Sequence, residues 1–156
     1  MNSPIPDIIR NMQDIAKRLR KLEARYFKDS PAPDPIERVA LNIVVGNGLY
    51  VIPTGIWCWI TISKFDLEIT TWKLVANASG SVELDVWAGA WGDLPLDSGD
   101  SMCDGHYPAL STAQTAKDTD LSDWSTTDLT AEDYIYINVR SCTTIKQVTL
   151  TLLGKE

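Results

Sequence analysis

Hydrophobic residues in the first 28 positions repeat with the period of a coiled coil. Seven apolar side chains between Ile5 and Tyr26 are spaced alternately three and four residues apart, which is the a/d pattern of a heptad. Asp7 can cap the start of a helix, and the prolines from Pro31 onward end it. Ile at the d positions favours three or four strands over two. The pattern predicts a coiled-coil stalk over residues 1–28 and a parallel homotrimer.

A short motif inside the stalk supports three strands. Arg18 at a g position precedes Glu23 at e by five residues, so the two can pair between neighbouring parallel helices. The segment resembles the short Arg-hydrophobic-x-x-hydrophobic-Glu trimerisation motif of parallel coiled coils. The alternatives are another oligomer, or one amphipathic helix packed on its own domain. The expected trimerisation residues are Ile5, Ile8, Met12, Ile15, Arg18, Leu19, Leu22, Glu23 and Tyr26.

Beyond a proline-rich linker over 29–37, the hydrophobic period changes from 3.5 to two. Alternating runs bounded by Gly, Pro and Asn predict short strands, and the stretch 110–117 is expected to hold one helical turn. Several short strands with no long helix predict a mainly β domain over 38–156, a jelly-roll-like antiparallel β-sandwich, with a barrel as the alternative. The expected strands lie near 39–45, 48–52, 55–62, 68–76, 81–88, 118–125, 133–139 and 145–153.

The alternation separates a core face from an outward face on each strand. The expected core residues are Ile56, Cys58, Ile60, Ile62, Trp72, Leu74, Ala76, Val82, Leu84, Val86, Ile135, Ile137, Val139, Val148, Leu150 and Leu152.

The outward faces hold five large rings, and exposed apolar patches usually mark contact surfaces. Three interpretations follow: contact between subunits of the trimer, which we favour; cover by the segment 89–117; or a ligand surface such as a sugar platform. Trp91 and Tyr107, in the long loop, would contribute to a platform. The outward rings are Trp57, Trp59, Trp87, Tyr134 and Tyr136.

Charge is divided unevenly along the chain. Residues 1–28 hold seven basic and three acidic side chains, and because the whole chain carries −7, residues 29–156 carry −11. An acidic β domain is unsuited to binding nucleic acid through its phosphates. No apolar run approaches the ~20 residues that a membrane helix needs, and no signal-peptide pattern precedes residue 30. We expect neither nucleic-acid binding nor membrane insertion, and synthesis in the cytoplasm.

Candidate chemistry is sparse. The single histidine, His106, lies near Cys103 and Asp104 in a loop, and sequence neighbours on a loop rarely form a preorganised catalytic site. The acidic loop 93–104 offers oxygens that suit calcium, but its spacing matches no EF-hand and a solvated loop is favoured. Three cysteines without CxxC or Cys/His spacing argue against a zinc site. We expect no enzyme, metal or cofactor, although a glycosidase carboxylate pair would leave no spacing signal.

Several segments in order carry a family resemblance. They read ITTWKLVA at 69–76, SGSVELDVW at 79–87, PALSTAQ at 108–114, DLSDW at 120–124, DYIYINV at 133–139 and VTLTL at 148–152. From Glu68 to Leu153 the chain resembles a β domain recurrent in tailed-bacteriophage virion proteins, and the loop 89–106 departs from that pattern.

The resemblance implies a structural protein of the virion, bound to other tail or capsid proteins. The expected function is a trimeric fibre or spike that can bind a host-surface glycan. The alternatives are a capsid decoration or head-fibre protein, and a glycan-degrading virion enzyme, which small size and the absence of repeats disfavour.

Overall fold

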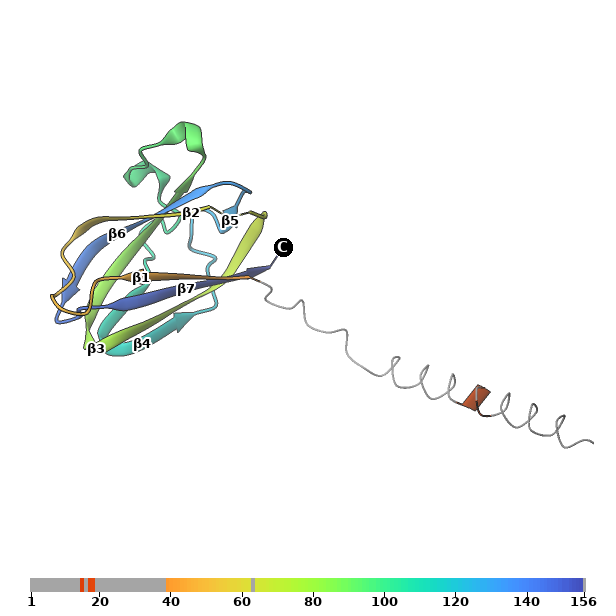
Figure 1. The fold of residues 1–156 in the computed structure, drawn as a ribbon, viewed down its shortest axis with the longest axis horizontal. Helices are drawn as coiled ribbons and strands as arrows, with labels where there is room; N and C mark the ends of the chain where they lie inside the picture. The colour runs from red at the N-terminus through yellow and green to blue at the C-terminus, as the bar shows by residue number, and fades with distance from the viewer. Residues whose placement is uncertain (1–14, 16, 19–38, 63, 156) are drawn as a thin grey trace, which may run out of the picture. The chain divides into compact units, whose positions relative to one another are not determined.

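The computed structural model describes residues 15, 17, 18, 39–62 and 64–155, with the side chains of 58–62 excepted (Figure 1). The chain divides into two units, residues 1–36 and 37–156. In the first unit, Ile15, Lys17 and Arg18 are helical and exposed, and Ile15 is 58% exposed. The other predicted trimerisation residues and the proline-rich linker lie outside the described residues, so the coiled coil stays a prediction.

The second unit is built from one curled antiparallel sheet (Figure 1). Its strands follow the order β1-β7-β3-β6-β2, and β4 and β5 also pair with β3. Two short 3₁₀ turns, η1 (Trp91–Asp93) and η2 (Ser98–Asp100), follow β3. The strands are β1 (Val39–Val45), β2 (Gly55–Ile62), β3 (Leu67–Gly89), β4 (Ala109–Asp118), β5 (Asp128–Leu129), β6 (Tyr134–Thr143) and β7 (Val148–Lys155).

Strand β3 is 23 residues long and organises the sheet. Strand β7 pairs with its residues 68–76, and β6 pairs with 81–89 along the same edge. Strand β4 pairs with the opposite edge of β3, both in the part that faces β7 and in the part that faces β6. Strands β1 and β2 pair in turn with β7 and β6. Three segments, 46–54, 77–80 and 144–147, therefore lie beside one another between the two halves of the sheet. The sheet curls at these segments, so that its two halves enclose the core.

Hydrogen bonds between these three segments replace those that regular strand pairing would supply. The Asn77 side-chain oxygen accepts from the backbone N–H groups of Lys146 (3.2 Å) and Gln147 (3.1 Å). The Ile52 N–H donates to the Ile145 carbonyl at 3.0 Å, and the Gly48 N–H donates to the Lys146 carbonyl at 2.9 Å. These contacts give partners to backbone groups that strand pairing leaves without one at the bend, so the strands can bend together.

The period-two pattern correctly predicted most of the core. All twelve predicted core residues on β3, β6 and β7 are buried. On β2 the prediction was wrong for Ile56, which is 54% exposed, while Trp57 packs against the core. Trp57 pairs with the buried Ile137 and Ile56 pairs with Asn138, and because directly paired residues lie on the same face of a sheet, Trp57 faces the core and Ile56 faces outward. The side chains of Cys58, Ile60 and Ile62 are outside the described set.

Four local predictions were wrong. Residues 48–52 form no strand, and 77–80 lie within β3 instead of breaking it. The expected helical turn at 110–117 is strand β4, and the weak strand at 118–125 is mostly turn. The mainly β, antiparallel prediction is confirmed, and the described strands belong to a single curled sheet. Polar and small residues concealed β4, because it lies at an edge with much of its length exposed.

The bend at Gly80 yields a stability prediction. A Cβ atom there would collide with Thr144 Oγ1 and lie only 2.6 Å from the Thr143 carbonyl oxygen, whereas nothing lies within 4 Å of a Cβ at Gly92. We expect Gly80→Ala to lower the free energy of unfolding by about 1–3 kcal/mol, as overpacking does. Gly92→Ala is the control and should change it far less. Chemical denaturation of both variants measures the difference, and equal stability would contradict the proposed bend.

Candidate functional site

The segment that follows β3 folds back over two of the outward rings. Trp87 and Tyr136 are cross-strand neighbours on β3 and β6, and both are buried together with Leu96. The Met102 N–H donates to the Val86 carbonyl at 2.9 Å, which ties the segment to β3. For these two rings the structure matches the second interpretation, cover by the long segment. We call Trp87, Leu96 and Tyr136 the capped cluster.

The remaining rings occupy separate places. Trp91, at the start of η1, is 71% exposed, and its ring centroid lies 5.4 Å from that of the half-buried Tyr134. Tyr107 is half-buried against the main core. Trp57 is half-buried, and its Nε1 donates to the Pro53 carbonyl at 3.3 Å. The Trp59 side chain lies outside the described set. The predicted rings that the structure describes therefore form no single platform, and Trp91 is the most exposed among them.

A charged network, which the sequence analysis missed, lies beside Tyr107. Arg140 on β6 donates from Nε to Glu83 at 2.9 Å and lies 3.9 Å from the Asp85 carboxylate. Its guanidinium carbon is 4.2 Å from the centroid of the Tyr107 ring, a cation–π geometry. Asp85 is buried and accepts from Ser101 Oγ at 2.6 Å. The network ties β3, β6 and the 101–107 segment together, which indicates a structural role.

The hydrogen bond to Glu83 holds the pKa of Arg140 above its usual value, so Arg140 keeps its charge. The signal in the sequence was the pair Glu83 and Asp85, whose alternation places both on the outward face of a strand that carries core residues between them. Their partner Arg140 is 55 or more residues away, and only the sheet register identifies it.

The structure separates the Cys/His/Asp trio. Cys103 is fully buried, and burial raises the pKa of its thiol to about 12, so it holds little reactive thiolate at neutral pH. His106 is exposed, and its Nδ1 lies 3.6 Å from a carboxylate oxygen of the exposed Asp123. A nucleophile and a base that face different environments form no catalytic pair.

The acidic loop uses its carboxylates locally. Asp97 caps η2 by accepting from the Gly99 N–H at 2.7 Å, and Asp100 accepts from the Asp97 N–H at 2.8 Å. Among the residues that the structure describes, no group of three His, Cys, Asp or Glu side chains is placed to hold a metal ion. Helix-capping therefore explains the spacing of these two aspartates.

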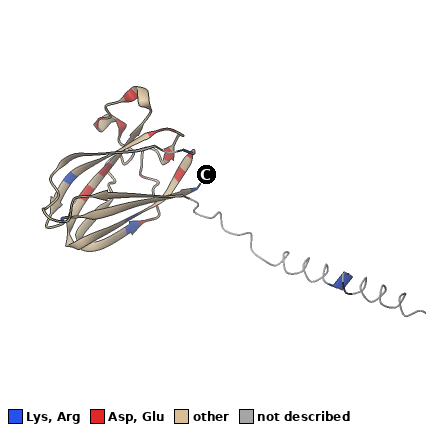
Figure 2. Cartoon of the chain, viewed as in Figure 1, with Lys and Arg blue, Asp and Glu red and all other residues tan. Residues whose placement is uncertain are grey.

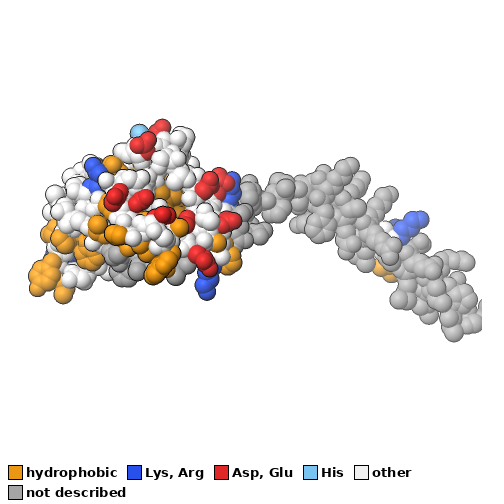
Figure 3. Space-filling view, turned by 90° about the horizontal axis from the view of Figure 1, so that it is seen from above, with side chains coloured by type: hydrophobic (Ala, Val, Ile, Leu, Met, Phe, Trp, Pro, Cys, Tyr) orange, Lys and Arg blue, Asp and Glu red, His pale blue; other side chains and the backbone are white. Residues whose placement is uncertain are grey.

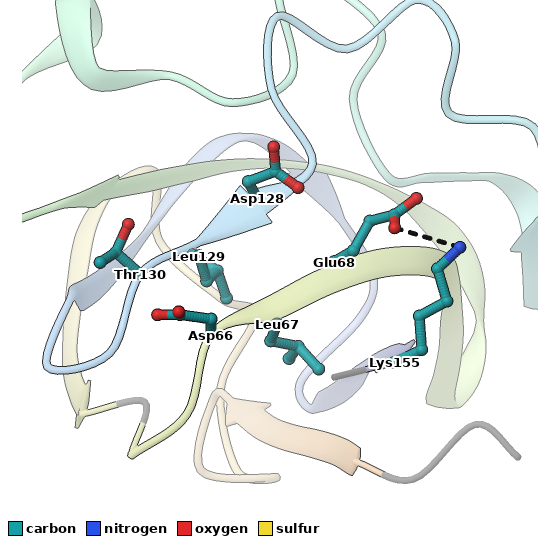
Figure 4. A pocket seen from close by; sticks show the side chains of 7 residues that line it. All are labelled: Asp66, Leu67, Glu68, Asp128, Leu129, Thr130 and Lys155. Carbon is teal, nitrogen blue, oxygen red and sulfur yellow. Dashed lines mark ion pairs between the residues drawn. The ribbon is translucent and has the colours of Figure 1, made fainter. Parts of the chain in front are cut away.

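A hollow of about 300 Å³ lies where β5 meets the start of β3 (Figure 4). Two of its carboxylates have partners: Lys155 Nζ lies 3.1 Å from Glu68, and Asp66 accepts from the Ala131 N–H at 2.8 Å. These contacts join the end of β7 and the 130–133 turn to β3. The hollow is open and has both charged and apolar side chains in its lining, which consists of Asp66, Leu67, Glu68, Asp128, Leu129, Thr130 and Lys155.

No family model matches the chain, and a sequence comparison with characterised proteins gives no match. The structure is similar to a chain of the capsid of Ralstonia phage GP4, with 13% identity, a TM-score of 0.44, and coverage of 81% of this chain and 90% of that one. It is also similar to the SPBc2 prophage-derived protein YomS, with 9% identity, a TM-score of 0.29, and coverage of 74% and 95%.

A third similar chain, from "CBM4 structure and function", has 16% identity, a TM-score of 0.32, and coverage of 82% of this chain and 90% of that one. Because each TM-score is below 0.5, the function proposed below rests on this chain's own residues. In the described part of the chain, no helix is long and apolar enough to cross a membrane. The β domain is thus structurally similar, at low identity, to a phage capsid chain and a prophage protein.

The capped cluster generates a test that separates cover from subunit contact. We expect Leu96→Ala to lower the free energy of unfolding by about 2–5 kcal/mol, because it leaves a cavity over Trp87, with no change in oligomeric state. Trp91→Ala, at an exposed ring, is the control and should cost about 1 kcal/mol through its contact with Tyr134. Melting curves and light scattering on the same samples measure both. Release of monomers by Leu96→Ala without loss of stability would show that these rings hold subunits together.

Proposed function

We propose that this chain is a non-enzymatic structural protein of a tailed-bacteriophage virion. It acts as a homotrimer, with an N-terminal stalk and three β domains that form a knob attached to the tail or capsid. The observation that carries the trimer is the stalk stripe, in which all seven a/d positions from Ile5 to Tyr26 are apolar and Arg18 and Glu23 are in phase. Such a strict, narrow stripe is typical of a seam between helices. The virion assignment is supported by the resemblance of the ordered segments between Glu68 and Leu153 to a phage virion β domain.

The described part of the stalk supports this proposal. Ile15 occupies a d position, is helical, and is 58% exposed within a single chain. A residue of a coiled-coil seam is expected to have its large apolar side chain exposed in a single chain, because the partner helices would cover it. Lys17 and Arg18 beside it are also helical and exposed, and they occupy the f and g positions, where a coiled coil keeps polar residues.

Three copies on one axis suit an adhesive or decorating protein. Weak contacts made by each β domain act together because the stalk holds them at a high local concentration. In the fibre or spike form of the proposal, the exposed Trp91 ring is the group best placed to contact a host-surface glycan. In the capsid decoration form, the same knob contacts the shell and needs no external ligand.

The assembly is tested at one seam residue with a matched control. We expect the purified protein to sediment at a mass near three times 17.3 kDa. Ile15→Asp should shift it toward monomers because it places three carboxylates in the seam, whereas Lys17→Asp, on the outward f position, should leave it trimeric. Sedimentation equilibrium measures both. A concentration-independent wild-type monomer contradicts the proposal, as would the absence of the labelled protein from virions in electron microscopy.

The non-enzymatic part of the proposal makes a separate prediction. His106 is exposed and contacts only the exposed Asp123 among its ion-pair partners in the described residues. We therefore expect His106→Ala to leave every activity of the protein unchanged. The measurement is release of reducing ends from the host's surface polysaccharide by wild-type and variant protein, with none expected from either. Hydrolysis by the wild type that the substitution abolishes would overturn the proposal.

A further inference from the structure

One long stretch of the β domain carries no charge. From Val39 to Ser63, 25 residues contain no Asp, Glu, Lys or Arg, although 22% of the chain is charged. At that fraction, a segment of this length would hold five or six charged residues, and at the composition of an average globular protein it would hold about six. The stretch includes β1, the loop 46–54 and β2 (Figure 2).

The strands that lack charge are the two ends of the sheet path. Strand β1 pairs only with β7 and β2 only with β6 among the described strands. Each therefore presents a row of backbone donors and acceptors that no described strand satisfies. Edge strands normally carry charges, especially Lys, to block association with other chains. Here β4, which lies along the other edge of β3, follows that rule with Lys117 and Asp118, while β1 and β2 do not.

The inner strands show that the missing charge is not a general property of the sheet. Exposed positions on β3 hold Glu68 and Lys73, and Arg140 lies on β6. At the corresponding exposed positions, β1 and β2 carry Ala40, Asn42, Val44 and Ile56. The distribution is therefore the reverse of the one expected for a solvated β domain, where the edges would carry more charge than the centre.

Apolar side chains are exposed on the same side of the domain. Tyr50 is 73% exposed, and Val44 is 39% exposed. The loop borders a hollow of about 280 Å³ that Tyr50, Pro53 and Trp57 help to line. Hydrophobic side chains gather at one end and along one side of the domain in Figure 3. We call β1, β2 and their connecting loop the uncharged wall; its exposed large apolar residues are Val44, Leu49, Tyr50, Val51 and Ile56.

We propose that the uncharged wall is the surface through which the β domains of the trimer contact one another, edge strand against edge strand. This inference rests on the proposed function. Charge selects the occupant: residues 29–156 carry −11, so two copies repel one another wherever their carboxylates face. A second copy can approach closely at the surface that holds no charge. An acidic or basic partner would instead be recognised by charges of opposite sign.

The test introduces one charge on the wall of the full-length protein. Val44→Lys places a lysine at the β1 edge, and Val75→Lys is the matched control, because Val75 is an exposed valine of β3 that is flanked by β7 and β4. We expect Val44→Lys to raise the concentration for half-dissociation of the trimer roughly tenfold, the loss expected at the centre of an interface, and Val75→Lys to leave it unchanged. Sedimentation velocity over a dilution series measures both.

A second variant keeps the test decisive if Val44→Lys does not fold. Tyr50→Lys lies in the loop outside any strand and should weaken the trimer in the same direction. A trimer that dissociates like the wild type in both folded variants would overturn the inference, while the stalk-based proposal would stand. If the variant trimers stay intact but no longer join virions, the uncharged wall binds another virion protein. That outcome would overturn the inference that a second copy of this chain occupies the wall. A wild-type monomer would overturn the proposed function, and the inference with it.

Discussion

The β domain depends on three chain segments bending at the same place. Strand β3 pairs along nearly its full length with β6 and β7, so it cannot turn unless the 144–147 segment turns beside it. The Asn77 side chain makes the two bends compatible, because its oxygen accepts from the Lys146 and Gln147 N–H groups that lack strand partners there. Gly80 adds to this, since its missing side chain leaves room for Thr144.

Two consequences follow from this shared bend. Strand β3 contributes to both halves of the curled sheet, so residues from its two ends reach one core without a connecting loop; they include Leu74, Ala76, Val82, Leu84 and Val86. The bend also fixes β1 and β2 at the open ends of the sheet path, where their backbone edges have no described partner. The same geometry that closes the core therefore leaves an open wall, and the lack of charge there becomes meaningful only once the topology is known.

The sequence predicted those features that depend on alternation alone. Period two identified the buried face of β3, β6 and β7, because every second residue of a strand must face the core. It failed at 77–80, where Asn, Ser and Gly resemble a turn signal, because the bend is set by partners of Asn77 that lie 69 and 70 residues away. It failed at Ile56 for a related reason: the face of each β2 residue is set by its pairing with β6, where Trp57 meets Ile137, and no property of the local sequence reveals that register.

In the candidate site, too, alternation predicted some features, while others depend on contacts between distant segments. Alternation correctly placed Trp87 and Tyr136 away from the main core, but it does not say what lies on them. The cover comes from Leu94 and Leu96, the two leucines in a loop otherwise rich in Gly, Asp and Ser. Isolated leucines in a polar loop were the available signal that the loop packs inward. The link between Glu83 and Arg140 could not be found from the sequence, because it needs the pairing register of β3 with β6.

An uncharged pair of edges would be a hazard in an isolated domain, since an edge that meets the edge of another copy can continue into an open chain of molecules. The proposed trimer removes the hazard by closure. On a threefold axis, each β1–β2 wall meets a neighbouring copy and the ring closes after three subunits. In the proposed trimer the predicted stalk, which has only three heptads, brings the β domains to a high local concentration. At that concentration a weak edge contact suffices, and the net charge of −11 on residues 29–156 disfavours arrangements in which the carboxylates of two copies face each other.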